Sequence, residues 1–309
     1  MNNRTPVLVF LAACVLFPGV LGGQTLRFGT TPATVTGTCQ LDTEVSLPQT
    51  IQVRHKGAAT SYFVTFSTGS SGSFAARTAV NGGRVLQYQI YDNLTNRNVQ
   101  KDLTASPAAS EVISGSMPQS NGFQTQTGAF TVYLLPGQLP PAGIYTDTIT
   151  MKLYPGTVGS PGAVQDTASF IVSITVNAAL DIALVPRGAP FSIYGTSLAL
   201  NLGVLAAGGT GSVDLVIRSN SLNSVTVSSQ AGGVLKNVDT TDPSTVPYSL
   251  AVNGTPASLA AGVPWPIVTS APATAFAGSR YTLTFTVGTA VWPTEGSYSD
   301  VLTFQATAN

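Results

Sequence analysis

Apolar and polar residues alternate over many short runs of the chain, and glycine, proline, serine and asparagine separate these runs. Such alternation is typical of a β-strand that has one face against a hydrophobic core. Clear runs lie at 62–66, 130–134, 213–217 and 281–287. With 31 glycines and 20 prolines among 309 residues, long helices are not expected. The pattern predicts an all-β fold of immunoglobulin-like sandwiches.

A pentapeptide pattern, G-x-Y-[ST]-D, occurs twice, and an alternating strand follows each copy. A further alternating run, 167–176, follows the first copy, whereas the sequence stops soon after the second. We therefore predict two domains, 24–177 and 178–309, of which the second lacks its last strand. The motif residues, expected to form a structural corner in each domain, are Gly143, Tyr145 and Asp147, and Gly296, Tyr298 and Asp300.

A sandwich that lacks a strand exposes an apolar groove and unpaired backbone edges. Burial of several apolar side chains in such a groove stabilises it by on the order of 6 to 15 kcal/mol, which is comparable with the stability of a whole domain. We therefore expect the second domain to accept a strand from another chain. The residues expected to line this groove are Val213, Leu215, Ile217, Leu302 and Phe304.

Residues 1–23 have the pattern of a secretory signal peptide. Arg4 precedes an apolar run, and small residues follow it. The apolar run is too short for a permanent membrane anchor. The sequence before Cys14 resembles a lipoprotein cleavage box, so lipidation of Cys14 is a competing interpretation, and both predict export. Removal of the leader leaves Cys39 without an internal partner, so that it is either a buried thiol or bridged to another chain.

Composition and residue types argue against nucleic-acid binding and against catalysis. Only 8% of residues are charged and the net charge is zero, so no basic stripe is expected. His55 is the single histidine; it stands between Arg54 and Lys56, is predicted to be exposed, and has no second histidine with which to bind a metal.

The two repeated carboxylates, Asp147 and Asp300, occupy equivalent positions in separate domains and are expected to orient turns. Tyr145 and Tyr298 are expected to bond backbone, as in the tyrosine corner of other sandwiches. The glycines at 208–211 lack the lysine and helix of a phosphate-binding loop. We therefore expect no enzyme, no catalytic residue, no metal site and no cofactor.

Several motifs in a fixed order resemble the spore coat protein U domain. This domain is found in archaic, Csu-type chaperone–usher pili of Gram-negative bacteria, and two-domain members with this layout are similar to the pilus tip adhesin. Family domains usually carry paired cysteines, which this chain lacks. The motifs are Tyr62-x-Val64, Ser67-x-Gly69, Arg77, Leu86-x-Tyr88-x-Ile90-Tyr91 and Gly143-x-Tyr145-x-Asp147, with the repeat at Gly296, Tyr298 and Asp300.

The resemblance implies a non-enzymatic pilus tip adhesin that crosses the periplasm and reaches the cell surface. Its implied partners are a periplasmic chaperone, an outer-membrane usher, an adjacent pilin that donates a strand, and a surface or receptor. Residues 24–35 contain few apolar residues and Pro32, which would make a poor donor strand and favours the tip position. The alternatives are a secreted coat or matrix protein without a pilus and a carbohydrate-binding module. A carbohydrate-binding module would require exposed aromatic residues. Trp265 and Trp292 lie beside prolines and are expected to serve packing of the second domain instead.

Contact with a target is expected at the end of the first domain that faces away from the second. Alternating strand directions place 67–73, part of 92–128, and 154–165 at this end. Apolar residues grouped on exposed loops commonly mark contact sites. We expect apolar fingers that contact hydrophobic or rough surfaces; the alternative is that the same side chains pack into their own domain. These residues are Val112, Ile113, Met117, Pro118, Tyr154, Pro155, Val158, Pro161 and Val164.

Overall fold

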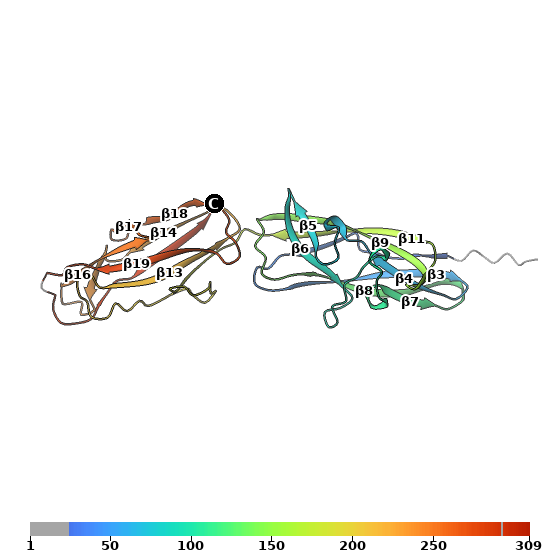
Figure 1. Cartoon of the computed structure of the whole chain (residues 1–309), viewed down its shortest axis with the longest axis horizontal. Helices are drawn as coiled ribbons and strands as arrows, with labels where there is room; N and C mark the ends of the chain where they lie inside the picture. The colour runs from blue at the N-terminus through green and yellow to red at the C-terminus, as the bar shows by residue number, and fades with distance from the viewer. Residues whose placement is uncertain (1–24, 292) are drawn as a thin grey trace, which may run out of the picture.

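The structure is a computed structural model that describes residues 25–291 and 293–309. Its strands form two elongated bodies that lie end to end and are joined at residues 177–179 (Figure 1). We call them the N-terminal and the C-terminal sandwich. The predicted signal peptide, Cys14 and Trp292 lie outside the described residues. Within the described ranges, no helix has the length and apolar character needed to cross a membrane.

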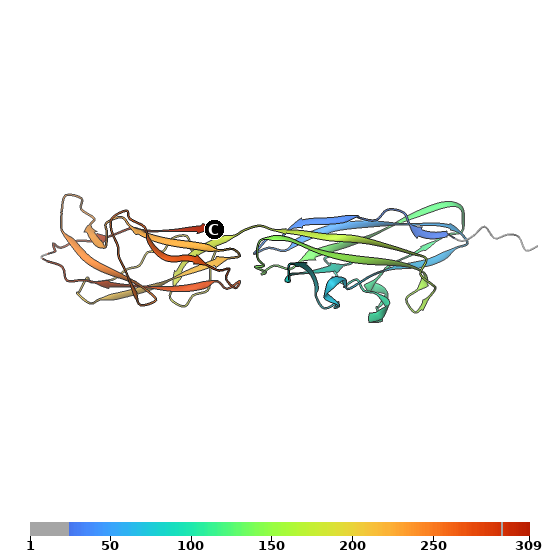
Figure 2. The same ribbon diagram turned by 90° about the horizontal axis from the view of Figure 1, so that it is seen from above.

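The N-terminal sandwich is a sheet that curls over on itself (Figure 2). Its strands are β1 (Thr25–Phe28), β2 (Thr34–Thr38), β3 (Val45–Gly57), β4 (Thr60–Phe66), β5 (Arg77–Asn81), β6 (Arg84–Tyr91), β7 (Ile113–Met117), β8 (Ser120–Leu134), β9 (Gly143–Thr157), β10 (Ser160–Pro161) and β11 (Asp166–Val176). Three short 3₁₀ helices are η1 (Gly69–Ser71), η2 (Leu103–Ala105) and η3 (Ala109–Glu111). The strand order is β1-β3-β8-β6-β5-β9-β11-β2, with β4 and β10 added to β9 and β7 added to β4. The predicted all-β fold class is confirmed.

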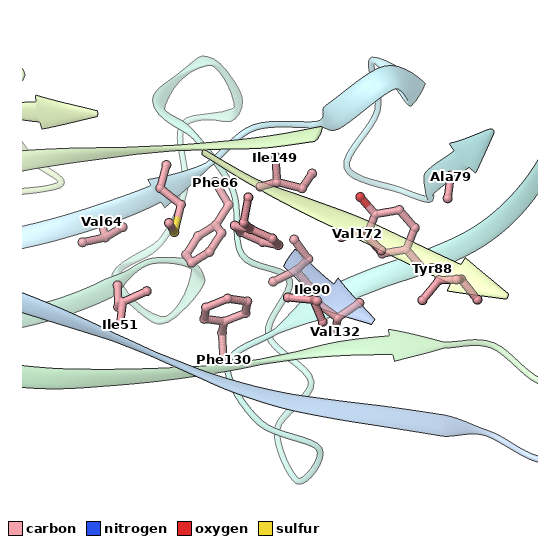
Figure 3. Packing of buried hydrophobic residues seen from close by; sticks show 14 of the residues in the cluster. Ile51, Val64, Phe66, Ala79, Tyr88, Ile90, Phe130, Val132, Ile149 and Val172 are labelled. Carbon is pink, nitrogen blue, oxygen red and sulfur yellow. The ribbon is translucent and has the colours of Figure 1, made fainter. Parts of the chain in front are cut away.

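The core of the N-terminal sandwich fills the space between its two layers (Figure 3). Ile51 on β3 and Phe130 on β8 face Phe66, Ile149 and Val172 on β4, β9 and β11. The ring centroids of Phe66 and Phe130 lie 5.0 Å apart in a tilted arrangement, which is favourable for aromatic pairs. These residues come from the alternating runs, so the pattern of the sequence directly fixes which face of each strand is buried.

The prediction that His55 is exposed is wrong. His55 is fully buried, and its Nε2 lies 2.7 Å from the carbonyl oxygen of Ala58. The reason is strand parity: Ile51, Val53 and His55 point to the core, whereas Arg54, between them, faces outward. The flanking residues Arg54 and Lys56 lie on the outward face of the strand and therefore do not report the environment of His55.

The C-terminal sandwich contains two separate sheets. Its strands are β12 (Leu180–Pro186), β13 (Thr210–Ser219), β14 (Asn223–Ser229), β15 (Val234–Asn237), β16 (Thr245–Val252), β17 (Thr255–Ala257), β18 (Trp265–Ala271), β19 (Ser279–Val287), β20 (Tyr298–Ser299) and β21 (Leu302–Ala308). One sheet has the order β12-β13-β19-β16-β15-β20, with β17 added to β16, and the other has the order β18-β14-β21. Trp265 is half-buried and packs against the core between the sheets.

The two sandwiches contact each other through polar side chains at the junction. The guanidinium of Arg218 on β13 donates to both carboxylate oxygens of Asp42, over 2.8 and 2.7 Å, and to Asp181 over 3.0 Å. Asn220 Nδ2 donates to the carbonyl of Pro140 over 3.1 Å. Arg218 is buried, whereas the side chains of its two acidic partners are 42% and 45% exposed. These contacts link β13 directly to a loop of the N-terminal sandwich.

The end of the N-terminal sandwich that faces away from the junction, which we call the far end, carries the turns 57–60, 117–120 and 157–166. The expectation that 67–73 also lies there is wrong. This loop contains η1, and Ser70 N donates to Asp147 Oδ1 over 2.9 Å, close to the junction end of β9. The reason is that β4 is short and ends opposite Met151, so the chain leaves the sheet halfway along β9.

Candidate functional site

A long apolar groove with a volume of about 1310 Å³ runs along the C-terminal sandwich. One wall is the stretch 195–205, which connects β12 to β13, and the other is 293–304, which includes the start of β21. Leu184, Val213 and Phe285 are among the side chains that line it. The groove therefore lies between the two sheets, at the edge where they are not joined.

β21 has one paired edge and one free edge. It pairs with β14 along its length, and in the described part of the chain no strand pairs with its other edge. Its inward residues Leu302 and Phe304 are only half-buried. In β9, which contains the first copy of the motif, the equivalent Ile149 and Met151 are fully buried, and β11 pairs with β9. The same strand position is thus covered in one sandwich and open in the other.

The opposite wall of the groove contains an alternating apolar pattern that the sequence analysis missed. Leu198, Leu200, Leu202 and Val204 alternate with other residues in a stretch without strand pairing. Leu200 and Leu202 pack against the core, whereas Val204 is 93% exposed. The spacing of two residues between these apolar side chains is the feature of the sequence that could have identified this wall.

The predicted groove residues divide into two groups. Val213, Leu302 and Phe304 line the groove. Leu215 and Ile217 are fully buried in the core of the same sandwich and do not line it. All five belong to one apolar cluster, so the groove is continuous with the core.

The repeated motif forms the same corner in both sandwiches. Tyr145 Oη donates to the carbonyl of Pro141 over 2.8 Å, and Tyr298 Oη donates to the carbonyl of Thr294, also over 2.8 Å. The acceptor lies four residues before the tyrosine in each case. These bonds close the turns that lead into β9 and β20.

The glycine of each motif allows a close approach by an asparagine. A Cβ on Gly143, whose φ is 149°, would lie 2.2 Å from Nδ2 of Asn81. A Cβ on Gly296, whose φ is 155°, would lie 3.0 Å from Nδ2 of Asn237. The pairing of β5 with β9 and of β15 with β20 thus places equivalent asparagines at equivalent corners.

The aspartate of each motif accepts a hydrogen bond from a buried tyrosine. Tyr88 Oη lies 2.6 Å from Asp147 Oδ2, and Tyr248 Oη lies 2.6 Å from Asp300 Oδ2. Burial raises the pKa of both tyrosines, and the hydrogen bond to the carboxylate raises each pKa further. Both tyrosines are therefore donors, and the aspartates serve to fix the loops around the corner.

The predicted apolar loop residues are not all at the surface. Exposure is wrong for Val112, Met117 and Tyr154, which are buried. Met117 lies on β7, which pairs with β4, and Tyr154 lies on β9 opposite Phe63. Val112 belongs to the same buried cluster as Phe63 and Tyr154. Tyr154 stacks on Phe63, with ring centroids 5.0 Å apart. By exposure, Ile113, Pro155 and Val158 are half-buried, whereas Pro118, Pro161 and Val164 are exposed.

The described residues do not contain a group of three or more histidine, cysteine or acidic side chains that could hold a metal ion. Cys39 is buried, and burial raises the pKa of its thiol, which keeps it protonated. Asp147 and Asp300 lie in different sandwiches and are each held by hydrogen bonds. The largest feature left to describe is therefore the groove along the C-terminal sandwich.

Comparison with known proteins places a Spore Coat Protein U domain at residues 6–152. No curated protein sequence matches the chain. Solved structures of similar fold include the CsuC–CsuE chaperone–tip adhesion subunit complex of Acinetobacter baumannii, at 12% identity and a TM-score of 0.42, covering 90% of this chain and 99% of that one. The CfaE adhesive subunit of enterotoxigenic Escherichia coli is 13% identical with a TM-score of 0.33, covering 90% and 93%. The CupB6 tip adhesin of Pseudomonas aeruginosa is 11% identical with a TM-score of 0.32, covering 91% and 93%.

Proposed function

We propose that this chain, whose residues 6–152 match the Spore Coat Protein U domain, is a non-enzymatic tip adhesin of a chaperone–usher pilus. In this proposal the C-terminal sandwich, 178–309, is the acceptor of a strand from another chain. The N-terminal sandwich, 24–177, contacts the target. The leader 1–23 directs export, and the mature protein reaches the cell surface at the pilus tip.

The observation that carries the proposal is the open edge of β21. Leu302 and Phe304 are half-buried where Ile149 and Met151 are fully buried. An extended segment in the groove would form main-chain hydrogen bonds with the free edge of β21, and its alternate side chains would cover these residues. Each apolar side chain buried in this way contributes about 1.5–3 kcal/mol.

The stretch 195–205 supplies the other side of the same slot. Its alternating leucines face the groove opposite β21 without a strand partner. A segment bound between them would join the two sheets and close the sandwich. A periplasmic chaperone would lend this segment before assembly, an outer-membrane usher would mediate exchange, and the adjacent pilin would supply the final strand.

Target contact is assigned to the far end of the N-terminal sandwich. Pro118 lies in the turn after β7, and Pro161 and Val164 lie between β9 and β11. All three side chains are exposed. Grouped apolar residues at loop tips fit contact with hydrophobic surfaces.

The test is co-expression of the full chain with a periplasmic chaperone of a chaperone–usher pilus. We expect a soluble complex, and aggregation of the chain without the chaperone. Phe304→Asp, which puts a charge in the groove, should abolish the complex. Gln305→Asp is the matched control, because Gln305 is exposed and outside the groove. A full chain that is monomeric and stably folded alone, with β21 amides protected from hydrogen exchange on both edges, would contradict the proposal.

A further inference from the structure

The outer face of β1 and β3 at the far end carries a basic cluster, defined here as Arg27, Arg54 and Lys56. Arg27 lies directly opposite Arg54 in the antiparallel pair. Lys56 follows Arg54 by two residues and therefore lies on the same face of β3. In Figure 1, β3 runs toward the far end, away from the C-terminal sandwich. The cluster thus lies on the part of the molecule that is furthest from the groove.

Among the described residues, no carboxylate forms an ion pair with the basic cluster. Arg97, Arg218 and Arg280, by contrast, each pair with an acidic side chain. The carboxylate of Asp166 accepts from Phe28 N over 2.8 Å and is thereby engaged by the backbone. Like charges directly opposite each other on neighbouring strands are destabilising. An anion that bridges Arg27 and Arg54 would remove this repulsion.

An aromatic ring holds both guanidinium groups in place. The Cζ atoms of Arg27 and Arg54 lie 4.8 and 4.7 Å from the ring centroid of Phe123 on β8. Phe123 is 41% exposed. A Cβ on Gly29 would lie 2.8 Å from Cγ of Arg54, so the methylene groups of Arg54 rest against this backbone. Because the guanidiniums are already positioned, they lose less conformational entropy when they bind a ligand.

Uncharged polar side chains surround the basic cluster on the same face. Thr125 lies opposite Arg54, and Thr127 lies opposite Gln52. Both threonines are exposed, and Gln52 is half-buried. Their hydroxyl and amide groups can donate and accept hydrogen bonds with ligand hydroxyls. The face therefore offers positive charge, a ring and neutral hydrogen-bonding groups within a few residues.

We propose that this face binds an acidic polysaccharide, whose carboxylate or sulfate groups are received by Arg27 and Arg54. A guanidinium matches the geometry of both groups, and Thr125, Thr127 and Gln52 would bond the sugar hydroxyls. A nucleic acid would require a longer basic stripe than three side chains on a chain of zero net charge. A membrane would require apolar side chains that are free to insert on this face, whereas the ring of Phe123 beside the basic cluster is occupied by guanidiniums.

The inference rests on the proposed function, since it names a ligand class for the end of an adhesin that contacts its target. The test measures binding of the full chain, purified in its chaperone complex, to immobilised polygalacturonate and to neutral dextran. We expect binding to polygalacturonate only, and weaker binding at about 300 mM than at about 50 mM NaCl because charge contacts are screened. Arg27→Gln together with Arg54→Gln should weaken binding at least about tenfold, as the loss of charge-assisted bidentate bonds requires.

The matched control is Arg84→Gln together with Lys152→Gln, which changes the net charge equally at exposed positions on β6 and β9. It should bind like the parent. Arg27→Lys with Arg54→Lys keeps the charge but removes the planar fork, and should lose a smaller part of the affinity. Unaltered binding by the Gln pair, or equal losses in the Gln pair and the control, would overturn the inference.

A further arm uses vesicles that contain phosphatidylserine. Binding of the parent chain to these vesicles, without binding to polygalacturonate, would overturn the inference in favour of a lipid headgroup. Failure here leaves strand acceptance by the groove untouched, because the chaperone complex is formed before any of these measurements.

Discussion

Tyr248 donates its phenolic hydrogen to Asp300 over 2.6 Å, and Tyr88 donates to Asp147 over the same distance in the other sandwich. The two pairs are equivalent by the repeated motif, yet their strands have different surroundings. Asp147 lies in β9, which pairs with β11, whereas Asp300 precedes the open β21. The corner is therefore built independently of whether the next strand position is filled.

Tyr248→Phe should destabilise the C-terminal sandwich. The substitution removes the hydroxyl and leaves Asp300 short of one donor in a half-buried position, a loss of about 1–3 kcal/mol. Tyr281→Phe is the control, because Tyr281 is half-buried and its hydroxyl forms no hydrogen bond with the described residues. Urea unfolding of the full chain in its chaperone complex measures both, and equal effects of the two substitutions would contradict the role of the Asp300 bond.

Gly69→Ala should be more destabilising than Gly72→Ala. The two glycines have nearly the same φ, +65° and +67°. Each alanine variant therefore loses roughly 1 kcal/mol because alanine disfavours the left-handed conformation. A Cβ on Gly69 would lie 2.0 Å from Asp147 Oδ2, whereas nothing lies within 4 Å of one on Gly72. We expect an additional loss of about 1–3 kcal/mol at Gly69 from displacement of a buried hydrogen-bonded carboxylate. Thermal unfolding of the two variants gives the difference, and its absence would mean that the loop moves freely away from Asp147.

Asp214→Asn should lower stability at neutral pH but not in acid. Burial alone would raise the pKa of Asp214, but hydrogen bonds from Gly188, Arg280 and Thr282 outweigh it and lower that pKa below its usual value. A lowered folded-state pKa gives stabilisation that is present above the unfolded pKa of about 3.9 and is lost as pH falls through the folded pKa.

The parent should therefore exceed Asp214→Asn by about 1.5–3 kcal/mol at pH 7, in line with hydrogen bonds to a charged group. The difference should shrink only below about pH 4. Urea unfolding across this range checks the sign. A difference that grows as pH falls would show that the pKa of Asp214 is raised in the folded protein.

Strand identity could be predicted from the sequence because alternation reports the local environment. The inward residues Ile149 and Met151 were recognisable from their period, and the repeated motif indicated that Leu302 and Phe304 occupy the same positions. The open edge of β21 followed from comparing the two copies. The wall at 195–205 was missed, although Leu198, Leu200, Leu202 and Val204 alternate in this stretch.

Long-range pairing was the part that the sequence could not supply. Val112 and Met117 were expected on a loop because serine, glycine and proline surround them. Pairing of β7 with β4 buries Met117, and Val112 is buried in a cluster with Phe63 and Tyr154. The basic cluster was present in the sequence as single residues. Only the register of β1 on β3 places Arg27 opposite Arg54, and only that of β8 brings Phe123 beside them.

The contact of Arg218 with Asp42 has a mechanical consequence. A pull that is applied at the far end and resisted at the groove passes along the covalent chain through residues 177–179. The paired charges beside this thin connection oppose bending, and Asn220, the residue that follows β13, donates to the carbonyl of Pro140. Bending of the two sandwiches relative to each other must therefore first break the contacts of Arg218 with Asp42 and of Asn220 with Pro140.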